Sequence, residues 1–320
     1  MAAAFAPLKD DLAFGTRVTG LTLADLADET VRERLRDAFE TRGLIHFAEV
    51  ETSPRMQVEL SKVFGPLKLH PVKAVDKPDP DFMPGAILIE ADPANCDIVE
   101  IAGKPYSSWL PWHFDHCYNN QLNRAGVLRL LEITPNGGQT CFADGIALYE
   151  ALPADLRAGI EDKSVIYSLD MQPDHIRFGR PENFRVLQVD PKQGEILEQA
   201  KDYPRAIHPA VWTRADGEKV LHLSPWMAEG LEGNETPEGD ALLEAVAREI
   251  IRLAEAGAYV HDWKPDDMLI WDNWRILHRV TGCTPPHRRA VLRTTIEGDY
   301  GLGRFEAGDQ GRYAALERTV

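Results

Sequence analysis

The sequence predicts a mainly β fold, an antiparallel sandwich or barrel with helices packed on its outside. Two observations favour this class. Short apolar segments separated by turn residues dominate the middle and the end of the chain, and helical patterns come before and between them. The length of 320 residues is also within the range of one large β-rich domain, which buries roughly three quarters of the surface that its unfolded chain exposes.

Two short helices are expected near the start of the chain. Residues 30–42 place apolar side chains at helical spacing, and Gly43 follows them as a C-terminal stop. Residues 54–64 are predicted to form the second helix, with Pro54 in its first turn and Gly65 after its end. We expect both helices to pack on the outside of the β core.

The remaining elements are mostly short strands, each an apolar run bounded by turn residues. These strand candidates cover residues 44–50, 86–90, 97–102, 126–133, 139–143, 219–224, 267–271 and 289–297. Residues 135–138 are predicted to form a hairpin turn, because Asn and Gly accept positive φ at little cost. Two further helices are expected at 146–160, with a break at Pro153, and at 240–256, with its start near Thr236.

Composition and charge restrict the class of protein. The chain is 44% hydrophobic and 27% charged, which excludes a disordered or fibrous protein. Its formal charge of −16 makes nucleic acid a poor partner, because an acidic surface repels phosphates. The Pro-rich segment 77–85 is too short to separate domains, so we expect one domain over residues 1–320, with short N- and C-terminal tails.

No segment is predicted to cross a membrane or to act as a signal peptide. The chain has no apolar run of about 18 residues, and its start lacks a basic region followed by a long apolar one. The four cysteines, Cys96, Cys117, Cys141 and Cys283, show neither a C-x-x-C pair nor a dense framework. This pattern favours a reduced protein, and we therefore expect a cytoplasmic location.

The most informative segment is PWHFDHCYN, residues 111–119. His113 and Asp115 are two positions apart, so on a strand both side chains would point to the same face. Two such ligands cannot hold a divalent metal alone. The best third ligand is His278, which follows the apolar strand 267–271 and is expected where the sheet ends in a loop.

Two histidines and one carboxylate on one side of a metal leave positions open for other ligands, as in non-haem Fe(II) oxygenases. A structural zinc site would instead fill four positions, usually with thiolates, and the cysteines here are not spaced for that. The H-x-D pair has little specificity by itself. A solvated strand histidine beside an acid produces the same letters, and His116 can be read as such a strand residue or as part of a pocket wall.

Two arginines after His278 point to an anionic ligand. Arg289 and Arg293 lie 11 and 15 positions after this histidine, in one predicted strand and on the same side of it. Inward-facing cations on an apolar strand are costly unless anions meet them. A guanidinium can bind a dicarboxylate through two parallel hydrogen bonds. The alternatives are that both arginines pair with Asp or Glu, or that they lie on an exposed face.

Together these residues resemble the taurine/2,4-D dioxygenase (TauD/TfdA) family of Fe(II)- and 2-oxoglutarate-dependent oxygenases. The resemblance covers most of the chain, from about residue 7 to residue 300. The segments that carry it are WHFD at 112–115, GGQT at 137–140, IWDN at 270–273, His278 and RRAVLR at 288–293. The family's usual G-G-D-T has Gln139 in place of Asp here, at a position that we assign to the turn.

The resemblance implies a double-stranded β-helix (jelly-roll) core with flanking helices. It also implies that His113, Asp115 and His278 hold Fe(II), and that Arg289 and Thr140 bind the distal carboxylate of 2-oxoglutarate. The implied reaction consumes O2 and 2-oxoglutarate, hydroxylates a substrate C–H bond and releases succinate and CO2. Because Asp115 is retained, the resemblance argues against halogenation.

The resemblance further implies a small-molecule substrate and a possible homo-oligomer. Arg293 matches a family arginine that often meets a substrate anion, so we expect a carboxylate or sulfonate substrate. His70 resembles a family position beside the substrate. Tyr106, Trp109 and Trp226 are candidate aromatic walls, although burial in the core would explain each of them equally well.

Two other functions are compatible with parts of the pattern. The first is a metal-dependent hydrolase or isomerase on a cupin-like barrel, which would need no keto acid. The pair Arg289 and Thr140 argues against it, since hydrolysis gives no reason for a buried dicarboxylate anchor. The second is a β-barrel binding protein without catalysis, which the retention of all three metal ligands argues against.

Overall fold

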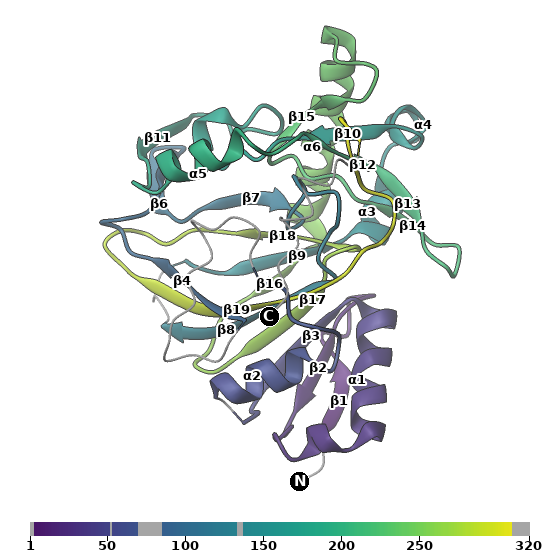
Figure 1. The fold of residues 1–320 in the computed structure, drawn as a ribbon, viewed down its shortest axis with the longest axis vertical. Helices are drawn as coiled ribbons and strands as arrows, with labels where there is room; N and C mark the ends of the chain where they lie inside the picture. Colours follow the sequence, from purple (N-terminus) through teal and green to yellow (C-terminus); the bar gives the residue numbers. More distant parts are fainter. Residues whose placement is uncertain (1–2, 52, 70–84, 133–136, 309–320) are drawn as a thin grey trace.

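The core consists of two β-sheets that face each other (Figure 1). A computed structural model describes residues 3–51, 53–69, 85–132 and 137–308. The larger sheet has the order β1 (Ala4–Pro7), β2 (Thr16–Thr19), β3 (Leu44–Ala48), β17 (Met268–Asp272), β8 (Ala125–Glu132), β19 (Arg289–Ile296) and β4 (Ala86–Ala91). The smaller sheet has the order β16 (Tyr259–His261), β9 (Thr140–Asp144), β18 (Ile276–Val280) and β7 (Leu110–His113). Apart from β2 with β3, the paired strands of these sheets run antiparallel.

Strand β17 shows how alternation of side chains builds two cores. Leu269 and Trp271 pack between the sheets, against Phe142 of β9. Met268 and Ile270 point to the opposite face and pack with the N-terminal helices. Because both faces are covered, the strand is a continuous apolar run instead of an alternating one.

The two N-terminal helices lie on the outside of the larger sheet, as the sequence predicts (Figure 1). Helix α1 (Glu29–Arg42) begins after Asp28, whose side chain accepts a hydrogen bond from the Thr30 N–H, and it ends at Gly43 with a φ of 71°. Helix α2 (Pro54–Ser61) is shorter than the predicted 54–64, since residues 62–64 form a turn.

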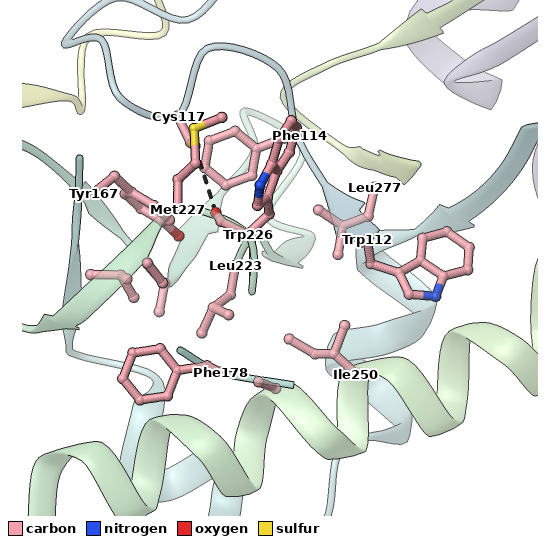
Figure 2. Packing of buried hydrophobic residues seen from close by; sticks show 14 of the residues in the cluster. Trp112, Phe114, Cys117, Tyr167, Phe178, Leu223, Trp226, Met227, Ile250 and Leu277 are labelled. Atoms are coloured by element: carbon pink, nitrogen blue, oxygen red, sulfur yellow. Dashed lines mark hydrogen bonds between the residues drawn. The ribbon is translucent and has the colours of Figure 1, made fainter. Parts of the chain in front are cut away.

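A second group of elements packs beyond the smaller sheet. Helix α6 (Pro237–Gly257) begins after Thr236, as predicted, and the predicted break at Pro153 separates α3 (Gly145–Ala151) from α4 (Ala154–Ile160). Figure 2 shows Ile250 of α6 in one apolar cluster with Trp112 of β7 and Leu277 of β18. The outer face of β7 and β18 is therefore fixed by packing, and the alternate residues of these strands point inward.

The sequence analysis missed the elements between residues 164 and 213. This part contains β10 (Ser164–Tyr167), η2 (Pro173–His175), β11 (Phe184–Gln188), α5 (Gln193–Ala200), β12 (Ala206–Pro209) and β13 (Val211–Thr213). The remaining elements are η1 (Asp25–Ala27), β5 (Ile98–Ile101), β6 (Lys104–Ser107), β14 (Lys219–Leu221), β15 (Ala228–Leu231) and β20 (Arg304–Phe305). Strands β11, β5 and β6 form a small sheet that lies with α5 next to β7, far from the N-terminal helices (Figure 1).

The predicted hairpin around residues 135–138 is wrong. Strand β8 pairs with β17 and β19, whereas β9 pairs with β16 and β18, so this connection passes from one sheet to the other. Residues 133–136 lie outside the described part of the chain, and Gly137 and Gly138 have φ values of 85° and 74°. Turn residues indicate that the chain reverses, but they do not determine which strands pair. Among the described residues, no helix has both the length and the apolar character needed to cross a membrane.

Candidate active site

A cavity of about 310 Å³ opens between the two sheets, next to β4, β7 and β19. It brings together six of the residues that the sequence singles out. These are His113, Asp115, Thr140, His278, Arg289 and Arg293. They come from four strands and one turn, and they are separated by up to 180 positions in the sequence.

The two histidines face each other across adjacent strands. His278 is paired with His113 in the register of β18 and β7, and their ring centroids are 4.1 Å apart. The Nε2 atoms of His113 and His278 lie 3.8 and 3.7 Å from Oδ1 of Asp115. The prediction that His278 lies in a loop at the end of the sheet is wrong, because a tight turn after β17 returns the chain into strand β18.

Asp115 lies just past the end of its strand. Strand β7 ends at His113, so strand alternation alone does not explain why the two side chains meet. The backbone N–H of Asp115 donates to Oδ1 of Asn273 at 2.7 Å, and Nδ2 of Asn273 donates back to the Asp115 carbonyl at 3.1 Å. Asn273, the last residue of the IWDN motif, thus fixes the turn that carries the carboxylate. The motif contains this residue, but the sequence alone does not indicate that role.

The protonation states suit metal binding. Nδ1 of His113 donates to the Pro111 carbonyl at 2.8 Å, which leaves Nε2 as the nitrogen with a lone pair for a metal. Burial lowers the pKa of His113 and of His278, so both rings are neutral near pH 7. Burial alone would raise the pKa of Asp115, but the nearby Arg293 guanidinium holds it well below its usual range.

The two arginines of β19 have different partners. Arg293 forms an ion pair with Asp115, in which Nη2 is 2.7 Å from Oδ2 and Nη1 is 3.3 Å from Oδ1, and its Nε donates to Thr295. Pairing with an acid, one of the alternatives for both arginines, is therefore what the structure shows for Arg293. The guanidinium still lines the cavity, and a guanidinium has five N–H donors, of which these contacts use three.

Arg289 is buried without such a partner. Its Nη2 donates to Oγ1 of Thr140 at 3.4 Å, and Nε1 of Trp263 donates to the same oxygen at 3.1 Å. Among the described residues, no carboxylate lies within 4 Å of this guanidinium, and its Nε makes no hydrogen bond. Burial lowers the pKa of Arg289 to about 10. A buried cation of this kind requires an anion, and the cavity offers the place for one.

A group of two histidines and one aspartate next to a cavity can bind a divalent metal. The ligand atoms of His113, Asp115 and His278 all lie within 4.8 Å of one another, and all three side chains are buried. Such a donor set leaves room for ligands that enter from the cavity. The residues present therefore fit both a metal and an anionic ligand beside it.

Comparison with known families decides the class. A family model described as "Taurine catabolism dioxygenase TauD, TfdA family" matches residues 4–295. The chain belongs to the TauD/TfdA family. It is a 2-oxoglutarate-dependent dioxygenase, an oxidoreductase that uses 2-oxoglutarate as a co-substrate together with a metal. The hydrolase and binding-protein alternatives are therefore wrong.

Characterised relatives of this dioxygenase differ in substrate. The chain is 30% identical over 298 residues to the (S)-phenoxypropionate/alpha-ketoglutarate-dioxygenase of Sphingobium herbicidovorans, covering 92% of this chain and 94% of the relative. It is 26% identical over 299 residues to the alpha-ketoglutarate-dependent 2,4-dichlorophenoxyacetate dioxygenase of Cupriavidus pinatubonensis, covering 89% and 95% of the two chains. At this level of identity the family is shared, and the substrate is not determined.

The fold of a solved structure agrees with the jelly-roll prediction. The crystal structure of AAD-2 in complex with Mn(II) and N-oxalylglycine superposes with a TM-score of 0.68 at 23% identity, covering 93% of this chain and 98% of that one. The mainly β double-stranded β-helix with flanking helices is thus confirmed.

The predicted substrate residues of the dioxygenase are only partly brought together. Trp109 and Trp226 line the cavity, and the Trp226 ring lies edge-on to His113 at 5.0 Å. Tyr106 lies on β6 and is not among the described residues that line the cavity. His70 lies outside the described part of the chain. His116 is buried in the cavity wall at a φ of 59°, in agreement with the pocket-lining interpretation.

The outer part of the cavity comes from a region that the sequence analysis did not interpret. Its lining includes Met171, Asp190, Lys192, Gln193 and Ile196, from the segment that contains η2, β11 and α5. No regular hydrophobic period marks this segment. The only indication in the sequence that this segment contributes to a site is its position. It is a Gly- and Pro-containing stretch that lies between two well-defined β regions.

Proposed function

We propose that this dioxygenase binds Fe(II) through His113, Asp115 and His278 and uses O2 and 2-oxoglutarate to hydroxylate a C–H bond of a small organic anion. The co-products would be succinate and CO2. The observation that supports this most strongly is the arrangement of one cavity. It places a compact His–Asp–His group beside a buried arginine that lacks an acidic partner among the described residues.

Arg289 and Thr140 are the proposed binding site for the distal carboxylate of 2-oxoglutarate. The guanidinium is buried, it is held against Thr140, and the Trp263 ring lies 5.8 Å from its Cζ atom. A carboxylate that enters this site would receive hydrogen bonds from both side chains. Such charge-assisted bonds are strong in a desolvated site, so they would orient the other end of the molecule toward the metal.

The protein would contribute positioning and exclusion of water. Iron, when bound, supplies the redox chemistry that couples decarboxylation of the keto acid to oxidation of the substrate. The chain fixes the carboxylate of Asp115 through Asn273 and Arg293, and it fixes the ring of His113 through Pro111. The aromatic and apolar walls around the metal group keep bulk solvent away from the reacting bond.

We propose a carboxylate with an aromatic or bulky apolar body as the substrate. Arg293 has N–H groups left to meet a substrate anion beside the metal group. The remaining walls are apolar and aromatic, and they include Trp109, Leu110, Met171, Ile196, Trp226 and Met227. The relatives named for phenoxypropionate and 2,4-dichlorophenoxyacetate support an aryloxyalkanoate of similar size.

The proposal is tested by measuring succinate formation with Fe(II), ascorbate and 2-oxoglutarate in air, with a panel of candidate acids. Aryloxyalkanoates, alkyl sulfonates and taurine are compared by substrate-stimulated O2 uptake. We expect stimulation by an aromatic carboxylate and its loss in His113→Ala. Stimulation by taurine alone would contradict the proposed substrate class. Succinate formation that persists in His113→Ala would contradict the proposed metal site.

A further inference from the structure

A second group of two histidines and one aspartate lies outside the active-site cavity. His46 is in the middle of β3, His261 is the last residue of β16, and Asp267 directly precedes β17. Strands β3 and β17 belong to the larger sheet and β16 to the smaller one, so the group joins the two sheets. None of the three residues lines the cavity that holds the proposed iron ligands.

The three side chains are buried and close together. Nε2 of His46 lies 3.1 Å from Oδ1 of Asp267, and Nε2 of His261 lies 3.3 Å from Oδ2. Their exposed fractions are 9%, 2% and 5% for His46, His261 and Asp267. All three ligand atoms lie within 4.8 Å of one another, as in the active-site group. This group is more compact, since the corresponding distances there are 3.8 and 3.7 Å.

The distances between these atoms fit ligands around a shared ion. Despite the short distances, neither Nε2 atom makes a hydrogen bond of normal geometry with another described residue. Ligands of one metal point at the metal and not at each other, and a tetrahedral zinc with bonds of about 2.0–2.1 Å keeps its ligand atoms roughly 3.3 Å apart.

We propose that His46, His261 and Asp267 form a second divalent-metal site, of the zinc type, that ties the two sheets together. Neutral imidazole and carboxylate are a donor set that suits zinc, and one further position would be filled by water. The site is structural and separate from the proposed oxygenase reaction, because its three residues are not among the described residues that line the cavity.

Neighbouring groups hold the proposed ligands in place. Nδ1 of His261 lies 2.9 Å from the hydroxyl of Tyr259, and a partner of this kind on the second ring nitrogen is typical of metal-bound histidines. The backbone N–H of Lys264 donates to Oδ2 of Asp267 at 2.9 Å, which orients the carboxylate. The Trp263 ring lies edge-on against His261 at 4.6 Å and closes one side.

The surrounding charges permit a cation at this place. Asp262 and Asp266 lie within one residue of the ligands in sequence. Two neighbouring arginines already have acidic partners: Arg17, which lies opposite His46 on β2, pairs with Glu49 at 3.2 Å, and Arg129 lies 3.9 Å from Asp266. Nζ of Lys9 lies over the Tyr259 ring, 5.4 Å from its centroid.

A metal at this site would also support the proposed 2-oxoglutarate site. His261 is paired with Thr140 in the register of β16 and β9. Trp263, which packs on His261, donates to the hydroxyl of the same threonine at 3.1 Å. Fixing His261 therefore restrains the side chains that hold Thr140.

The test uses full-length, tag-free protein stripped with a chelator, loaded with excess Zn²⁺ and desalted before metal analysis. An Asp115→Ala/His278→Ala background removes the active-site group, so that any retained zinc reports on the second site. We expect one zinc ion per chain in this background and none after the further change His261→Gln. The matched control is His175→Gln, which alters an exposed histidine paired with Asp170 and should leave the zinc content unchanged.

Two more measurements keep the result clear if His261→Gln folds poorly. His46→Gln in the same background must also lose the zinc, and Zn²⁺ must raise the midpoint of thermal unfolding of the background protein. Co²⁺ as a probe should give the intense visible bands of low-coordinate cobalt–histidine sites. A background protein that retains no zinc and shows no thermal shift overturns the proposal, as does zinc content that is equal in all variants. Either result would leave the three residues as a buried polar group without a metal, and neither depends on whether the oxygenase proposal is correct.

Discussion

Two arginines four residues apart on one strand have different partners, because the groups around each of them differ. Arg293 is ion-paired with Asp115, whereas Arg289 has only the hydroxyl of Thr140 as a hydrogen-bond partner among the described residues. The sequence places both on the same side of β19 and cannot distinguish them. The difference arises from Asp115, which reaches β19 only because the turn after β7 is fixed by Asn273.

The first prediction concerns Arg289→Ala. Because a charge-assisted hydrogen bond contributes about 1.5–3 kcal/mol, removal of the guanidinium should raise the KM for 2-oxoglutarate roughly 10- to 100-fold. Steady-state succinate formation at varied 2-oxoglutarate measures this. Arg288→Ala is the control, since Arg288 is exposed and pairs with Glu90 on the surface. An unchanged KM in Arg289→Ala would mean that another residue binds the co-substrate.

At the scale of elements, strands β7 and β18 separate the chemistry from the packing. Their inward residues, His113 and His278, face the cavity, while Trp112 and Leu277 pack toward α6 on the other side (Figure 2). A shift of either strand by one residue would exchange these two faces. The apolar cluster beneath α6 therefore fixes the register on which the candidate metal site depends.

The second prediction concerns the contact between β8 and β17. A Cβ atom at Gly126 would lie 2.7 Å from the Trp271 indole, and the Trp271 ring in turn lies 4.7 Å from the His278 ring. Gly126→Ala should therefore lower the free energy of unfolding by about 1–3 kcal/mol. It should also weaken iron binding, because a displaced Trp271 ring would push against the neighbouring His278 ring, which is a proposed iron ligand.

Urea unfolding and iron titration check this prediction. Gly194→Ala is the matched control, because Gly194 lies in helix α5 with no atom within 4 Å of the added Cβ. We expect this control to be neutral or slightly stabilising, since alanine favours a helix. Equal stability of the two variants would show that the contact with Trp271 is not restrictive.

Some elements could be predicted from the sequence and others could not, for physical reasons. Helix α1 and helix α6 have strong 3.6-residue periods and capping residues at Asp28 and Thr236, so their starts are found within a few residues. Strand β18 was missed because the three residues between β17 and β18 are enough to reverse the chain, and no Gly marks the turn. Strand pairing between the sheets depends on contacts that are distant in sequence.

At the scale of the whole molecule, buried histidines make stability depend on pH. Burial lowers the pKa of His208 to about 3 and that of His222 to about 4. The unfolded chain binds these protons below about pH 6.5, whereas the folded protein does not until the pH is much lower. The unfolded state therefore binds more protons in this range, and the free energy of unfolding falls as the pH falls from about 6.5 toward 4.

The third prediction is that His222→Gln reduces this dependence. Nε2 of His222 donates to the Asn273 carbonyl at 2.8 Å, which a glutamine amide can also do, but glutamine does not titrate. The lowered pKa of His222 corresponds to a loss on the order of 3 kcal/mol in the free energy of unfolding between pH 7 and pH 4. Urea unfolding of metal-free protein at several pH values measures the slope. If the free energy of unfolding depends on pH with the same slope in His222→Gln and in the parent protein, the prediction is contradicted.

The candidate site as a whole was easier to predict than its surroundings. The two histidines, Asp115, Thr140 and Arg289 were identified because the family resemblance links short motifs that no local pattern connects. Pairing of Arg293 with an acid was left open as an alternative without Asp115 being named, and the cavity wall around α5 was not identified. Both depend on how the segment from β10 to β12 and the turn after β7 fold over the sheets. The spacing of residues in the sequence does not predict how these segments fold.

The central claim is that His113, Asp115 and His278 bind ferrous iron beside a site for 2-oxoglutarate. An anaerobic titration with Fe(II) and then 2-oxoglutarate, followed by visible absorption, tests it most directly. We predict a visible band that requires both additions, that is absent in His278→Ala and that needs more 2-oxoglutarate in Arg289→Ala. A band of equal intensity in His278→Ala, or none in the parent protein, would contradict the claim.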